Sequence, residues 1–180
     1  MGGRMSKKIA LGGLMGALAL VILLMGGLIP VATFCAPALS GMVILIAAAE
    51  CGLKLGWTLY LAVALLGLLL VPDKELAMVF AFLLGYYPLF KVKLEKLRPR
   101  LLRAAAKAAV FNGALAAAYG LLLTIFPIAS LKQELDATTQ GFAALLIALG
   151  NLTFWVYDLA LVRVVQLYNA KLRPRLRRLY

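Results

Sequence analysis

The chain has 180 residues, a length that suits one domain. Hydrophobic residues make up 64% of it and charged residues only 14%. A soluble domain carries roughly 25% charged residues and could not bury this much apolar surface. The net charge is +12, with no histidine and two cysteines. This composition excludes imidazole metal ligands and a disulfide framework, and it predicts a membrane protein that needs neither a metal nor another cofactor.

Continuous apolar runs follow one another along the chain. About 20 apolar residues cross the hydrocarbon core as a helix, and runs without alternation argue against strands. The first run follows three cations, but it is longer than the apolar core of a signal peptide and further runs come after it. We expect one all-α domain over residues 1–180, a bundle of six transmembrane helices. The predicted spans are residues 9–29, 37–52, 55–71, 76–90 (interrupted at Pro88), 104–127 and 141–163.

The basic residues indicate how these spans are oriented. With the N-terminus inside, every Lys and Arg except Lys74 and Lys132 falls on an inner segment. This is the positive-inside asymmetry, and an even number of spans places both termini in the cytoplasm. The chain is therefore predicted to be a multi-pass protein of the bacterial cytoplasmic membrane.

The hexapeptide KLRPRL occurs at residues 96–101 and again at residues 171–176, just inside the predicted membrane. Its cations suit anionic lipid headgroups, and apolar residues between them predict an interfacial segment over 91–103 and a basic tail over 171–180. Docking of a cytosolic partner is the alternative; nucleic acid is disfavoured because no aromatic platform accompanies the charges. The predicted lipid or cytosolic docking residues are Lys96, Arg98, Arg100, Arg103, Lys171, Arg173 and Arg175.

Polar side chains inside the last two spans predict an intramembrane ladder of Asn112, Tyr119, Asn151 and Asp158. If the two helices are antiparallel, their depths pair Asn112 with Asp158 and Tyr119 with Asn151. The ladder either holds the two helices together or takes part in gating or ligand contact. Arg163 lies five residues after Asp158, which is an imperfect position from which to neutralise it.

Two further groups of residues are candidates for contacts. Small residues four apart on the first span, Gly12 with Gly16 and Gly13 with Ala17, permit close approach of a partner helix. The outer connections could cap a cavity open to the outside, although plain solvated loops explain them equally well. The predicted substrate-binding residues are Thr33, Cys35, Tyr119, Asn151 and Trp155.

This arrangement resembles the substrate-binding S components of energy-coupling factor (ECF) transporters. The resemblance lies in the six helices, the cytoplasmic termini, the length and the small residues of the first helix; the stretch PALSGMVILIAAAECGLKLGW at residues 37–57 is loosely similar to the second helix and turn of such proteins. It implies capture of a vitamin-like nutrient from outside. It also implies a coupling subunit that contacts the first helix at an AxxxA-type pattern, to which Gly12/Gly16 and Gly13/Ala17 are the nearest match, and separate ATPases.

Two functions follow as hypotheses. The first is a substrate-capture subunit for a small nutrient, without ATPase activity of its own because the chain lacks a phosphate-binding GxxxxGK[ST] loop. The second is a non-transporting scaffold or accessory protein that binds lipid or a partner through its basic cytoplasmic face. An enzyme is not expected, since histidine, a Gly-x-Ser-x-Gly motif and paired carboxylates at equal depth are all missing from the sequence.

Overall fold

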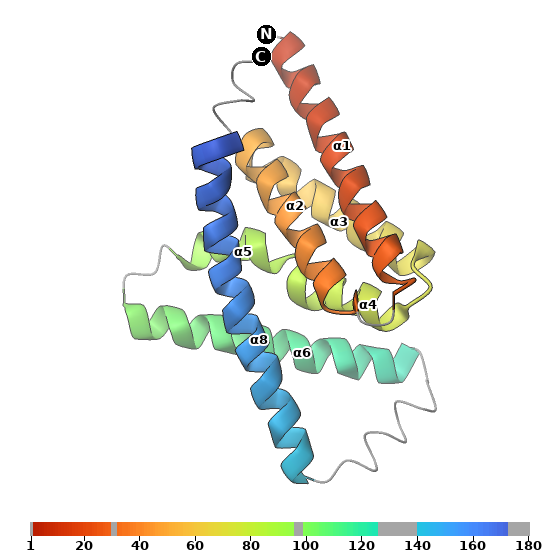
Figure 1. Ribbon diagram of the computed structural model, residues 1–180, viewed down its shortest axis with the longest axis vertical. Helices are drawn as coiled ribbons and strands as arrows, with labels where there is room; N and C mark the ends of the chain where they lie inside the picture. Colours follow the sequence, from red (N-terminus) through yellow and green to blue (C-terminus); the bar gives the residue numbers. More distant parts are fainter. Residues whose placement is uncertain (1, 30–31, 96–98, 126–139, 173–180) are drawn as a thin grey trace.

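The computed structural model describes residues 2–29, 32–95, 99–125 and 140–172. Only helices, turns and bends occur among these residues, which confirms the all-α prediction (Figure 1). The elements are α1 (Gly2–Gly26), α2 (Cys35–Cys51), α3 (Leu53–Leu70), α4 (Lys74–Val79), η2 (Phe80–Leu84), α5 (Tyr87–Leu94), α6 (Arg100–Ile125), α8 (Gln140–Leu167) and η3 (Tyr168–Leu172).

Five helical stretches in the described residues are long and apolar enough to cross a membrane, and α2 is a shorter apolar helix. They confirm that the chain has the helices of a membrane protein. Each predicted span overlaps a helical segment, although α1 begins seven residues before the predicted start of the first span and residues 126 and 127 of the fifth lie outside the described residues. The five stretches are Ser6–Gly26, Leu53–Leu70, Lys74–Leu94, Arg100–Ala118 and Ile147–Lys171.

Helices α1, α2 and α3 pack side by side and form the first part of the molecule (Figure 1). The buried Ser40 hydroxyl on α2 donates to the Ala19 carbonyl of α1 over 3.0 Å, so a polar group is satisfied inside the contact. The turn between α2 and α3 is a single residue, Gly52, whose φ of 98° suits glycine. This turn and the start of α1 lie at the same end of the molecule, where the Cys51 thiol donates to the Lys8 carbonyl.

The fourth apolar stretch is an interrupted helix, composed of α4, the π-helical turn η2 and α5. It begins where Asp73 caps α4 by accepting from the Leu76 amide over 3.1 Å. The chain bends at Gly85 and Tyr86, and Pro88 lies in the first turn of α5. The predicted interruption at Pro88 was therefore misplaced: the break precedes it, because the first turn of a helix tolerates proline and the preceding turn does not.

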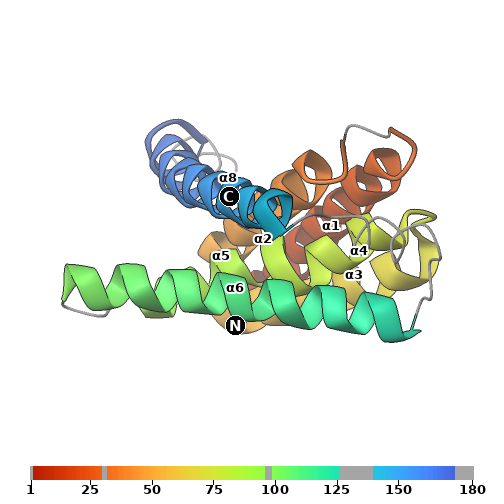
Figure 2. The same cartoon turned by 90° about the horizontal axis from the view of Figure 1, so that it is seen from below.

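Helix α6 lies across α8 instead of alongside it, and the two views of the molecule agree on this (Figures 1 and 2). The prediction that these helices run antiparallel, with polar groups matched by depth, was wrong. Side chains meet only near the crossing, because two crossed helices approach each other over a short length. The interrupted helix packs against both α6 and α8. Its turn η2 contacts α6, and a hydrophobic core that includes Tyr87, Phe111 and Phe154 joins α5, α6 and α8.

Candidate functional site

The break in the fourth helix leaves two backbone carbonyls without their usual helical partners. The Gly85 amide donates to the Phe80 carbonyl over 2.8 Å, as in a π-helix, and so does not serve the carbonyl of Ala81. Pro88 has no N–H, so the carbonyl of Leu84 loses its donor as well. Since unpaired carbonyls are costly away from water, both must find other donors.

Two tyrosines supply those donors. The Tyr60 hydroxyl of α3 donates to the Ala81 carbonyl over 2.5 Å, and the Tyr157 hydroxyl of α8 donates to the Leu84 carbonyl over 2.9 Å. Two neighbouring helices, α3 and α8, thus stabilise the same irregular turn. Neither tyrosine was predicted from the sequence. The signal that was available was the proline at 88, which implies an orphan carbonyl four residues earlier.

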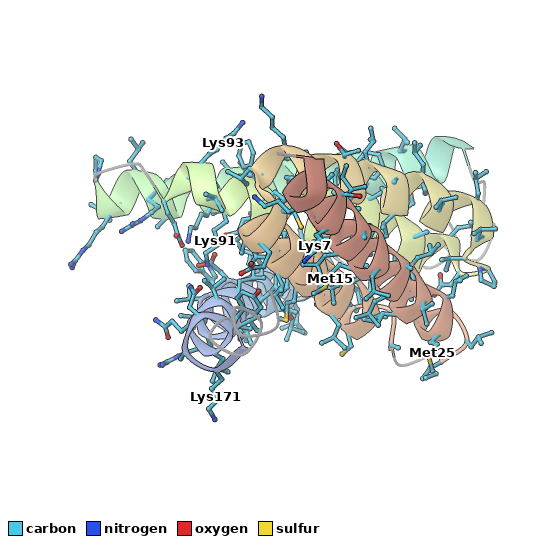
Figure 3. The ribbon with its side chains drawn as sticks, turned by 90° about the horizontal axis from the view of Figure 1, so that it is seen from above. Lys7, Met15, Met25, Lys91, Lys93 and Lys171 are labelled. Carbon is cyan, nitrogen blue, oxygen red and sulfur yellow. The ribbon has the colours of Figure 1, made fainter. Side chains whose placement is uncertain are left out.

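A cluster of buried polar side chains lies where α5, α6 and α8 meet; we call Tyr87, Lys91, Lys107 and Asp158 the polar centre. Asp158 Oδ1 accepts from Tyr87 Oη and from Lys91 Nζ, each over 2.5 Å, and Asp158 Oδ2 accepts from Lys107 Nζ over 2.8 Å. Lys91 Nζ also donates to the Asp158 carbonyl over 2.6 Å. Figure 3 shows Lys91 directed toward α8, while Lys93 points away from it.

The three charged members of the polar centre are more than nine-tenths buried, with exposures of 5% for Lys91, 7% for Lys107 and 6% for Asp158. A carboxylate so buried is stable only with cations and hydrogen-bond donors around it. The carboxylate here has three donors from two other helices. It joins α5, α6 and α8 at one point, so any change in their relative positions must break charge-assisted hydrogen bonds.

The predicted polar ladder was wrong in its pairing of Asn112 with Asp158. Two ammonium groups hold the carboxylate, because they bind it more strongly than an amide does. Asn112 instead pairs with Asn151, each amide nitrogen donating to the other's oxygen over 2.9 and 3.1 Å. The predicted pairing of Tyr119 with Asn151 stays a prediction, because the Tyr119 side chain lies outside the described residues. Arg163 is exposed.

The reciprocal pair of Asn112 and Asn151 leads to a stability prediction. Asn112→Ala and Asn151→Ala should each lower the free energy of unfolding by about 0.6–2 kcal/mol, the range of interhelical hydrogen bonds in membranes. The double variant should cost less than the sum, because either single change already removes both hydrogen bonds. Unfolding by denaturant in detergent measures this, with Gln166→Ala, at an exposed position of α8, as the amide control. Strict additivity would contradict the pairing.

An apolar cavity of about 410 Å³, open to the surface where Leu61 and Leu65 are exposed, lies on the other side of the break, between α3, η2 and α6. Tyr60, Leu65, Phe82, Tyr86 and Ala114 are among its lining residues. Tyr60 and Tyr86 meet edge to face, with ring centroids 6.5 Å apart. A wall of this kind suits an apolar or aromatic compound. Consecutive tyrosines therefore serve two sites, because Tyr86 faces the cavity and Tyr87 belongs to the polar centre.

Four of the predicted substrate-binding residues, Thr33, Cys35, Asn151 and Trp155, do not line this cavity, and the side chain of the fifth, Tyr119, lies outside the described residues. Cys35 is exposed at the start of α2, and Thr33 lies just before it in the connection from α1. Trp155 is 37% exposed on α8, and Asn151 is engaged with Asn112. The residues predicted from the sequence come from an outer loop and the last two spans, whereas the cavity is lined mainly by apolar side chains.

The small residues of α1 divide into an inner and an outer pair. A methyl group at Gly12 would lie 2.8 Å from the Leu55 side chain, and one at Gly16 would lie 3.1 Å from Leu59, so this pair packs against α3 within the chain. It was wrongly predicted to contact a partner. Gly13 has no atom within 4 Å of such a methyl group, and Ala17 is exposed, so this second pair faces outward from the chain.

The predicted docking residues are only partly described. Arg100 and Lys171 are exposed and Arg103 is half-buried, whereas Lys96, Arg98, Arg173 and Arg175 lie outside the described residues. The predicted interfacial segment 91–103 includes the end of α5 and the start of α6, and its first residue, Lys91, is buried. Lys91 was wrongly counted with the surface charges, since it belongs to the polar centre.

Comparison with known proteins does not identify the chain. It matches no protein-family model, no curated protein and no solved structure.

Proposed function

We propose that this chain is a non-enzymatic membrane subunit that captures a small, vitamin-like solute in the apolar cavity beside the interrupted helix. Separate coupling and ATPase subunits would supply the energy for uptake. The N- and C-termini would lie in the cytoplasm of a bacterial cell, as the distribution of basic residues favours.

The interrupted helix Lys74–Leu94 is the observation that carries this proposal. In this stretch, 72% of the residues in its 18-residue apolar window are buried inside the protein. The corresponding share is 17% to 22% in the other four membrane-spanning stretches. Irregular backbone at membrane depth is tolerated only where protein buries it or where it lines a cavity, and discontinuous helices are typical of substrate sites in transporters. Here the break has the tyrosine-lined cavity on one side and the polar centre on the other.

A scaffold that binds lipid or a partner is the second candidate. The exposed cations Lys93 and Lys171 (Figure 3), together with exposed Arg100, favour it, because such groups near a membrane surface attract anionic headgroups. The scaffold needs no cavity, so a substitution that fills the cavity separates the two functions.

The test is purification from the native membrane, followed by mass spectrometry of the denatured protein. A capture subunit should bring down an ATPase and a coupling subunit, and should release a bound small compound. Ala114→Leu places extra volume in the cavity and should abolish the compound, while the exposed Ala116→Leu on the same helix should retain it.

Equal amounts of compound from both leucine variants would exclude the cavity as its site. Recovery of neither compound nor ATPase, with retention of a partner that is lost when Arg100 and Arg103 become glutamine, would favour the scaffold.

A further inference from the structure

Lys107 is a buried ammonium group whose donors are mostly unused within the described residues. Its Nζ makes one hydrogen bond there, to Asp158 Oδ2 over 2.8 Å, and an ammonium group has three donors. Lys91 differs, because its Nζ reaches the Asp158 carbonyl, Asp158 Oδ1 and, at 3.6 Å, Glu95 Oε1. The polar centre therefore satisfies one lysine much better than the other.

The charges in the polar centre are also unequal. Two buried ammonium groups share the single buried carboxylate of Asp158. Glu95 adds a negative charge at the margin, but its side chain is 46% exposed and it lies beside Lys91, not Lys107. Buried charges are stable when they are paired, so the excess positive charge at Lys107 favours an additional anion.

Two further cations precede Lys107 on the same helix, α6. Arg100, Arg103 and Lys107 lie at i, i+3 and i+7, which places them on one face of a helix. Their burial increases in that order, from exposed Arg100 through half-buried Arg103 to buried Lys107. Neither arginine forms a salt bridge with an acidic residue in the described part of the chain. These two arginines attract an anion and raise its local concentration next to Lys107.

We propose that Lys107 is the inner end of an oxyanion-binding site that Arg103 and Arg100 extend to the surface. The ligand group is a phosphate or a carboxylate, because both offer several oxygens to ammonium and guanidinium donors. Its source is either the headgroup of an anionic lipid or a free solute. The site is distinct from the apolar cavity, and it does not depend on whether the chain works with a coupling subunit.

The experiment uses the purified full chain with inorganic phosphate or acetate as the soluble probes and with lipid as the third. Thermal unfolding is followed in an uncharged detergent against each soluble probe, with sodium chloride holding the ionic strength constant. It is then repeated in nanodiscs of phosphatidylcholine, with and without phosphatidylglycerol. Because an anion that binds only the folded state raises its stability, the midpoint should rise with the concentration of the matching probe.

Three variants locate the effect. Lys107→Met should weaken the apparent affinity at least about tenfold, the expected loss for one charge-assisted hydrogen bond. Lys107→Arg should restore most of it, because the charge and the donors return. Lys93→Met removes the same charge from an exposed position of α5, not of α6, and should leave the response unchanged.

A response to phosphate or acetate that Lys107→Met removes assigns the site to a soluble oxyanion. A response to phosphatidylglycerol alone, removed by the same substitution, assigns it to a lipid headgroup. Equal responses of wild type and Lys107→Met, or no response to any probe, would overturn the proposal. So would equal losses in Lys107→Met and Lys93→Met, since they would reveal a general effect of surface charge.

Discussion

Asp158→Asn is expected to lower the free energy of unfolding by about 3–5 kcal/mol, the cost of breaking a buried ion pair from one side. Asparagine preserves the shape of the side chain but removes the only buried carboxylate of the polar centre. Lys91 and Lys107 would then be two buried positive charges without a carboxylate to pair with in the polar centre. Unfolding by denaturant in detergent measures the loss, and spectra of helix content verify that the variant folds before titration.

Lys107→Met is the control for this effect. It removes one of the two cations but leaves Asp158 paired with Lys91, so its free energy of unfolding should stay within about 1 kcal/mol of wild type. Adding Lys107→Met to Asp158→Asn should recover part of the stability, because one of the two unpaired cations disappears. Wild-type stability of Asp158→Asn would contradict a charged, structural role for this carboxylate.

Continuous apolar runs predicted where the helices lie, because such runs are the strongest local signal in a membrane sequence. They did not predict how the fourth helix is interrupted. The π-helical turn at Phe80–Leu84 depends on hydroxyl groups from α3 and α8, and those are contacts between distant parts of the chain. The crossing of α6 and α8 was missed for a related reason, since depth along a span says nothing about the direction of its neighbour.

The candidate site was found only in part. Asp158 and the two asparagines were identified because polar residues in an apolar span are unusual. Their partners were not, since the positive-inside rule counts Lys91 and Lys107 as loop charges and cannot distinguish a buried lysine from an exposed one. Lys107 did carry a local signal: it is the only charged residue in a run of alanines inside the expected fifth helix.

Gly41→Ala is expected to destabilise the fold by about 2–5 kcal/mol through overpacking and an unsatisfied carbonyl. A methyl group at Gly41 would lie 2.7 Å from the Leu84 carbonyl oxygen and 2.6 Å from the Tyr157 hydroxyl oxygen. The carbonyl belongs to backbone fixed by the π-helical turn, so the tyrosine must move. The Leu84 carbonyl, already deprived of its helical donor by Pro88, would then lose the hydroxyl as well.

Tyr157→Phe separates the two contributions to the effect of Gly41→Ala. Alone it should cost about 1–3 kcal/mol, because it leaves the Leu84 carbonyl buried without a donor. Combined with Gly41→Ala it should cost less than the sum of the two, since the absent hydroxyl leaves room for the new methyl group. Gly13→Ala is the control on an open face of α1, where alanine should be neutral or should add up to about 1 kcal/mol through its helix propensity. Equal stability of the Gly41→Ala and Gly13→Ala variants in the same unfolding assay would mean that α2 does not approach the interrupted helix as closely as the contacts at Gly41 require.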